Sequence, residues 1–158
     1  MKKVLGIKPI INYKKNENTV DIRTFRKERV LGVIENIGLK ISPKWNRTKI
    51  PEKFMKEEHF PSVLKGLFDA DGSVTIFNNN GVLYPRLEIK ICPSMVQGQI
   101  QMILDKLNFN YRVQKLDKGK IRVRINGKKE LERWFEIIGS SNNLHKKRAQ
   151  QFLKKKVL

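Results

Sequence analysis

Residues 64–72 read LKGLFDADG and place an acidic residue at the end of a short, closely packing helix. An apolar stripe with i, i+3 and i+4 spacing is formed by Leu64, Leu67 and Phe68. Gly66 and Ala70 lie four residues apart on one helical face, where small side chains let a second backbone come close. Two such helices side by side would bring two Asp71 carboxylates together. This arrangement predicts a site for a divalent metal ion, because such ions prefer oxygen ligands.

Periodicity and turn residues predict the elements around this segment. The helix is expected to end at Asp71 and Gly72, where glycine supplies the backbone freedom of a helix stop, and strand 73–77 follows. Beyond a turn at 78–81 we predict strand 82–91, a helix from Ser94 to Leu107 with Ser94 as its N-cap, strands 109–116 and 120–126, and helices 128–138 and 143–154. Ahead of the segment we predict strands 4–12 and 19–24, a polar turn at 14–18, and a helix at 26–37 with Val30, Val33, Ile34 and Ile37 inward. The order indicates an α+β fold.

On these residues the chain resembles the LAGLIDADG homing endonucleases, in particular the archaeal, intein-type branch. Residues 64–72 match the family motif, with Lys65 in place of its usual small second residue. Residues 49–52 lie a short linker upstream of the motif helix, and in this they resemble the segment before the second motif of two-motif members. Residues 138–143, followed by Lys146, resemble the segment that closes a repeat.

The resemblance also implies the domain organisation. It predicts a complete αββαββα repeat with an antiparallel DNA-binding sheet at residues 51–158, and a shortened repeat without a motif helix at residues 1–50. One chain then carries one motif and half of a two-carboxylate centre. A homodimer through Gly66 and Ala70 would supply the other half, because a symmetric interface joins the same patch of each subunit.

The resemblance makes Asp71, with the backbone carbonyl of Ala70, the ligand of a Mg²⁺ cofactor, and makes Asp71 and Lys146 the catalytic residues. From the residues alone, Asp71 also fits a helix cap, and Lys146 lies in a basic run that also fits a solvated face. His145 is an alternative for the place of Lys146. Asp69, nearer the packed part of the helix, is interpreted as structural.

Alternating residues in the predicted strands leave one sheet face polar and mostly cationic. The DNA-binding candidates on that face are Thr75, Arg86, Glu88, Lys90, Arg112, Gln114, Arg122, Arg124 and Asn126, and Asn110 also points outward. Tyr111 and Val113 are expected to point inward. A twisted ribbon of this kind suits the major groove of DNA, where Arg reads guanine and Asn or Gln reads adenine. Ordinary solvated strand faces are the alternative.

Composition agrees with a polyanionic partner. The chain has 158 residues, with 34 Lys and Arg against 15 Asp and Glu, and a formal charge of +19. A single cysteine, Cys92, excludes an internal disulfide framework and suits a reducing compartment. We find neither a signal peptide nor a membrane span, and expect a cytoplasmic, intracellular protein.

Together these features predict a sequence-specific double-strand DNA endonuclease, derived from a mobile intron or intein, that uses metal-assisted phosphodiester hydrolysis. The first alternative is a non-cleaving DNA-binding remnant or regulator of the same fold. The second is an RNA-binding maturase that aids intron splicing.

Overall fold

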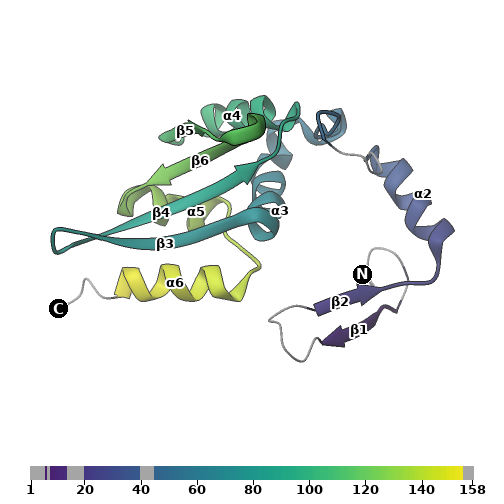
Figure 1. Ribbon diagram of the computed structural model, residues 1–158, viewed down its shortest axis with the longest axis horizontal. Helices are drawn as coiled ribbons and strands as arrows, with labels where there is room; N and C mark the ends of the chain where they lie inside the picture. The colour runs from purple at the N-terminus through teal and green to yellow at the C-terminus, as the bar shows by residue number, and fades with distance from the viewer. Residues whose placement is uncertain (1–5, 7, 14–19, 40–44, 155–158) are drawn as a thin grey trace. The chain divides into compact units, whose positions relative to one another are not determined.

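The computed structural model describes residues 6, 8–13, 20–39 and 45–154 (Figure 1). The chain forms two compact units, Met1–Ser42 and Pro43–Leu158. This boundary lies earlier than the predicted division between residues 50 and 51. The reason is that Ile50 is buried in the second unit, where its N–H donates to Gln99 Oε1 at 2.7 Å and its carbonyl accepts from Gln99 Nε2 at 3.0 Å.

The described residues of the first unit form a two-stranded antiparallel sheet and one helix. These are β1 (Ile10–Tyr13), β2 (Val20–Arg23) and α2 (Lys27–Ile37). The predicted turn at 14–18 and the start of the predicted strand at 4–12 lie outside the described residues. The four α2 side chains predicted to point inward are half-buried, and no residue of α2 is fully buried. The helix ends at Gly38, whose φ of 80° is a left-handed stop that glycine adopts without strain.

The second unit carries the predicted order of helices and strands, which confirms the α+β fold. Its elements are α3 (Phe60–Asp71), β3 (Gly72–Asn79), β4 (Val82–Ile91), α4 (Val96–Lys106), β5 (Tyr111–Lys115), β6 (Ile121–Asn126), α5 (Lys128–Ile137) and α6 (Asn143–Lys154). The four strands form one antiparallel sheet in the order β3-β4-β6-β5. No helix of the described residues is both long and apolar enough to cross a membrane.

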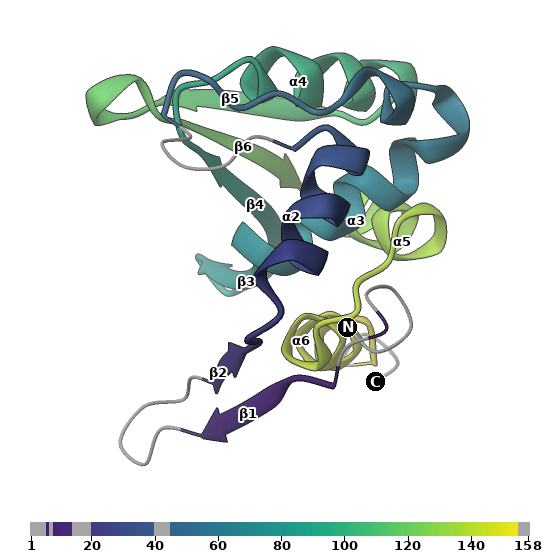
Figure 2. The same cartoon turned by 90° about the vertical axis from the view of Figure 1, so that its right-hand side faces the viewer.

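Helices cover one face of this sheet and leave the other face open, as Figure 2 shows from the side. Side chains of α3, α4 and α5 pack on the alternate residues of the strands that point toward them. The fully buried core includes Leu64, Phe68, Leu87, Ile103 and Trp134. The Phe68 and Trp134 rings lie 5.0 Å apart between α3 and α5.

α6 lies along β3, at one edge of the sheet (Figure 1). His145, Ala149 and Phe152 form its buried side. Arg148 Nη1 donates to the carbonyl of Val74 at 3.2 Å, so this helix supplies a hydrogen-bond partner to an edge strand.

Three local expectations need correction. Met95, not Ser94, is the N-cap of α4, and the Ser94 hydroxyl instead donates to the carbonyl of Cys92 at 3.2 Å. Gly72 ends α3 with φ −90° and ψ 168°, an extended conformation open to any residue. Glycine is needed there for space, because a Cβ atom would lie 2.2 Å from Phe68 Cδ2. Val113 points toward the helical face but is 39% exposed, because β5 is an edge strand.

Candidate nucleic-acid interface

The open face of the sheet contains all the predicted DNA-binding side chains. Antiparallel pairing sets them in three cross-strand rows: Thr75, Arg86 and Asn126; Glu88, Arg124 and Arg112; and Lys90, Arg122 and Gln114. Residues directly opposite one another across antiparallel strands share a face. The strand alternation of the sequence is therefore confirmed as a single surface, here called the polar face.

The polar face combines five cationic side chains with one carboxylate, Glu88. Glu88 Oε1 accepts from Arg124 Nε at 2.7 Å and lies 3.6 Å from Arg86 Nη1. Its side chain is 19% exposed, so these contacts are partly shielded from solvent. The carboxylate therefore holds two guanidinium groups in place on the surface without cancelling its positive charge.

Arg86 has two further contacts that fix its orientation. Its Nε donates to Asn126 Oδ1 at 3.0 Å, and its guanidinium lies 4.2 Å from the ring centroid of Phe77. A cation over an aromatic ring is attracted by the negative face of that ring. The orientation of the Arg86 guanidinium is thus fixed before a ligand binds.

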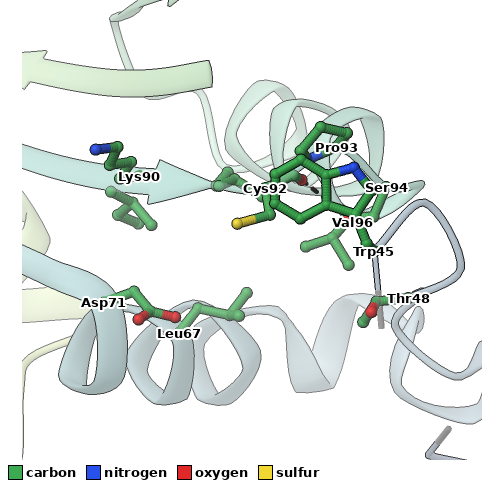
Figure 3. Close-up of a pocket in the computed structure, with 11 residues that line it drawn as sticks. Trp45, Thr48, Leu67, Asp71, Lys90, Cys92, Pro93, Ser94 and Val96 are labelled. Atoms are coloured by element: carbon green, nitrogen blue, oxygen red, sulfur yellow. Dashed lines mark hydrogen bonds between the residues drawn. The ribbon is translucent and has the colours of Figure 1, made fainter. Parts of the chain in front are cut away.

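Asp71 is the last residue of α3, and its side chain is exposed. It lines a pocket together with Leu67 of the same helix, Trp45, and Lys90 of β4 (Figure 3). β3 starts at the next residue and pairs Gly72 with Ile89, which brings Asp71 to the end of the row that contains Lys90. An accessible carboxylate therefore borders the polar face.

Asp69, two residues earlier, has a different environment. Its carboxylate accepts from the Ser140 hydroxyl and from the backbone N–H groups of Ser141, at 2.8 and 3.0 Å, and Asn142, at 3.4 Å. Partial burial raises the pKa of Asp69, but these hydrogen bonds outweigh it and leave the pKa below its usual value. The interpretation of Asp69 as structural is confirmed, since it ties α3 to the loop before α6.

His145 is buried, which excludes it as the accessible group near a metal-bound water. Its ring lies 4.7 Å from that of Phe68, and Nδ1 is 3.3 Å from the Ser140 hydroxyl. Burial is the main cause that lowers its pKa. Lys146, the next residue, is exposed on α6, and within the described part of the chain no hydrogen bond or ion pair joins it to Asp71.

Gly66 and Ala70 are exposed on the same helix as Asp71. A Cβ atom added to Gly66 would meet nothing within 4 Å. Both small residues predicted to face a partner helix are thus exposed, and the described residues leave space for a side chain at Gly66.

The oxygen ligands of this site fit magnesium in type but not in number. Asp71 offers a carboxylate and Ala70 a backbone carbonyl, both hard ligands. However, the described residues contain no group of three or more His, Cys, Asp or Glu side chains placed to hold a metal. The described residues of a single chain therefore offer fewer protein ligands than a complete metal site needs.

Three residues near the polar face were missed from the sequence. Phe77 and Tyr84 stand opposite each other in the β3–β4 pair, at positions that strand alternation assigns to the outward face. Glu130 lies on α5 and accepts a hydrogen bond from Asn110. No local pattern indicates that contact, because it joins residues that lie twenty positions apart in the sequence.

The fold and site thus define an α+β domain with a small-residue helix that ends in an accessible acid beside a cationic antiparallel sheet. The family model described as "LAGLIDADG-like domain" matches residues 62–139. The chain thus contains a LAGLIDADG-like domain at residues 62–139.

Solved structures of low similarity include several endonucleases. The homing endonuclease I-CvuI, in complex with the I-CreI target in the presence of magnesium with DNA not cleaved, is 20% identical with a TM-score of 0.47, over 62% of this chain and 66% of that chain. The LAGLIDADG meganuclease I-CpaMI, bound to uncleaved DNA, is 23% identical with a TM-score of 0.44, over 60% and 38%. The group I intron-encoded I-CeuI, complexed with DNA, is 12% identical with a TM-score of 0.45, over 81% and 62%. The chain thus spans less than two thirds of the length of each. A comparison with curated proteins found no match.

Proposed function

We propose that the protein is a sequence-specific endonuclease that binds double-stranded DNA on the polar face and cleaves it at Asp71. The observation that carries this proposal is the position of Asp71 at the end of the row formed by Lys90, Arg122 and Gln114. A duplex held on the cationic rows would have its phosphates close to the one accessible acid of the motif helix.

The proposed roles follow from the chemistry of each group. Magnesium bound by Asp71 and the carbonyl of Ala70 would activate water and stabilise the charge that develops on the phosphate. Lys146 would contribute a positive charge near the attacking water. The arginines would contact phosphates and base edges, with Glu88 holding Arg86 and Arg124 in orientation.

We further propose that the active enzyme is a homodimer through the motif helix. The exposed face of Gly66 and Ala70 supports this, since a second copy of α3 could approach closely there. The same contact would bring two Asp71 carboxylates together and complete the metal site. The target would then contain two related half-sites, because the dimer axis repeats the polar face.

One observation favours a second candidate, a DNA-binding protein without cleavage activity. Only Asp71 offers an accessible carboxylate at the end of the motif helix, and the described residues include no three-ligand cluster. A monomer with this structure would bind DNA but lack a complete metal site.

Selection from a randomised duplex library, followed by cleavage of the selected sequences, tests the proposal. We expect enrichment of one sequence, and cleavage that requires magnesium and rises with the dimeric fraction. Specific binding without cleavage at any protein concentration would favour the second candidate. Equal binding to all duplexes, or tighter binding to structured intron RNA, would overturn the proposal.

A further inference from the structure

A polar hollow lies where β4, β6 and the start of β5 meet. It is lined by Tyr84, Arg86, Asn110, Tyr111, Arg112 and Asn126. The Tyr111 hydroxyl donates to Asp105 Oδ1 at 2.9 Å. Burial is the main cause that raises the pKa of Tyr111 to about 12, and this contact with Asp105 adds to it. The remaining hydrogen-bonding groups include the amides of Asn110 and Asn126.

The orientation of the Asn110 amide is set by Glu130. Asn110 Nδ2 donates to Glu130 Oε1 at 3.2 Å. A carboxylate accepts hydrogen bonds and donates none, so Asn110 must turn its NH₂ group toward Glu130. Its carbonyl oxygen, Oδ1, is then free to accept a hydrogen bond from a ligand.

The Asn126 amide has the opposite orientation, with its oxygen engaged and its NH₂ group free among the residues that the structure describes. Its Oδ1 accepts from Arg86 Nε, and a guanidinium only donates, so Asn126 presents its NH₂ group as a donor. The hollow therefore offers one acceptor and one donor whose identities are set by their partners.

The buried carboxylate of Glu130 lowers the stability of the fold. The residue is 7% exposed, and its Oε2 has no hydrogen-bond partner among the described residues. A buried carboxylate oxygen without a partner destabilises the fold, and an apolar side chain would avoid that cost. A role in presenting Asn110 accounts for a carboxylate at this position.

We infer that Asn110 and Asn126 form a base-reading pair of fixed polarity in this hollow, and that Glu130 is a positioning residue for Asn110. The inference rests on the proposed binding of duplex DNA. Asn110 Oδ1 would accept from an exocyclic amino group in the major groove, which adenine and cytosine present, and Asn126 Nδ2 would donate to a neighbouring ring nitrogen or carbonyl. The hollow thus selects an amino-bearing base edge at one position of each half-site.

The test is Glu130→Gln, which keeps the shape but can donate as well as accept. Asn110 is then free to present either end of its amide. We expect discrimination at one target position to fall roughly tenfold, equivalent to about 1.4 kcal/mol, with preferences elsewhere unchanged. Asn110→Ala should relax the same position, and it keeps the inference testable if Glu130→Gln unfolds.

The matched control is Glu132→Gln on the same helix. Its side chain is 49% exposed and pairs with Lys128 at 3.3 Å, so it repeats the change of charge away from the hollow. We expect its binding profile to equal that of the wild type. A wild-type protein without sequence preference would refute the proposed function. A selective wild type whose profile survives both Glu130→Gln and Asn110→Ala would refute only the inference.

Discussion

The backbone N–H of Ser141 donates to Asp69 Oδ2 at 2.8 Å, across 72 positions of the sequence. This bond separates the roles of the two acids in the motif. Asp69 is engaged by the loop that leads into α6, whereas Asp71, two residues later, is exposed at the helix end. Substitutions at the two positions should therefore have different consequences.

Asp71→Asn should abolish cleavage and leave DNA affinity equal or slightly higher. Asparagine keeps the size of aspartate but lacks the charge that would hold magnesium, so cleavage should be lost. It also removes a negative charge beside the DNA phosphates, so the affinity should not fall. Nicking in magnesium and affinity in calcium should be measured together. Glu136→Gln, an exposed change on α5, is the control. Cleavage at the wild-type rate would exclude Asp71 from the active site.

Asp69→Ala should lower the free energy of unfolding by about 1–3 kcal/mol, because it leaves the buried Ser140 hydroxyl and nearby N–H groups without their acceptor. Urea denaturation measures the change. Asp71→Asn serves as the comparison and should unfold at nearly the wild-type midpoint. If Asp69→Ala proves as stable as the wild type, the tie between α3 and the loop contributes little.

DNA affinity should fall steeply with salt, because the polar face would displace counterions from phosphates. If about six phosphates are neutralised, the affinity should fall roughly a thousandfold between 50 and 200 mM salt. Fluorescence anisotropy with a labelled duplex measures this slope. Arg122→Gln, on the third row, should reduce the slope by about one. A flat response would contradict binding through the cationic rows.

The free energy of unfolding should decrease as the pH falls below about 6.5. Burial lowers the pKa of His145 from its usual value of 6.5; Arg148 adds to this, while Asp69 and a backbone hydrogen bond with Gly72 oppose it. The unfolded chain then binds this proton at a higher pH than the folded chain, so protonation favours unfolding. NMR titration of the two histidines should show His145 titrating below 6.5. A higher value would reverse the predicted pH dependence.

Gly66→Leu distinguishes a free helix face from an interface. Nothing lies within 4 Å of a Cβ atom at Gly66, so in a monomer the better helix former should stabilise α3 by up to about 1 kcal/mol. In a dimer joined at this face, leucine should separate the subunits. Molar mass in solution and the melting temperature should be measured together. Gly98→Leu on α4, also exposed with open space, is the control. An unchanged dimer would show that α3 is not the contact.

The sequence predicted the second unit well, because its periodic apolar residues each point to one continuous core. Strand β4 has the predicted bounds and helix α3 ends at the predicted Asp71, although it begins four residues before the motif, and the polar face follows from alternation alone. Contacts between segments that are far apart in the sequence could not be predicted from local sequence patterns. The bond between Asp69 and Ser141 and the bond between Asn110 and Glu130 both depend on how helices pack, which no spacing encodes. Glycine at residue 72 was expected for its backbone freedom, yet the side chain of Phe68 is what excludes a larger residue.

The protected edge of the sheet has a consequence for how the protein behaves at high concentration. An unpaired strand edge is a template on which another chain can extend a sheet. α6 occupies the β3 edge and Arg148 bonds the Val74 carbonyl there, while β5 at the other edge is short and has exposed Arg112 and Lys115. Copies of this unit at high concentration would therefore meet no long apolar edge on the four-stranded sheet, and these sheets would resist joining into aggregates.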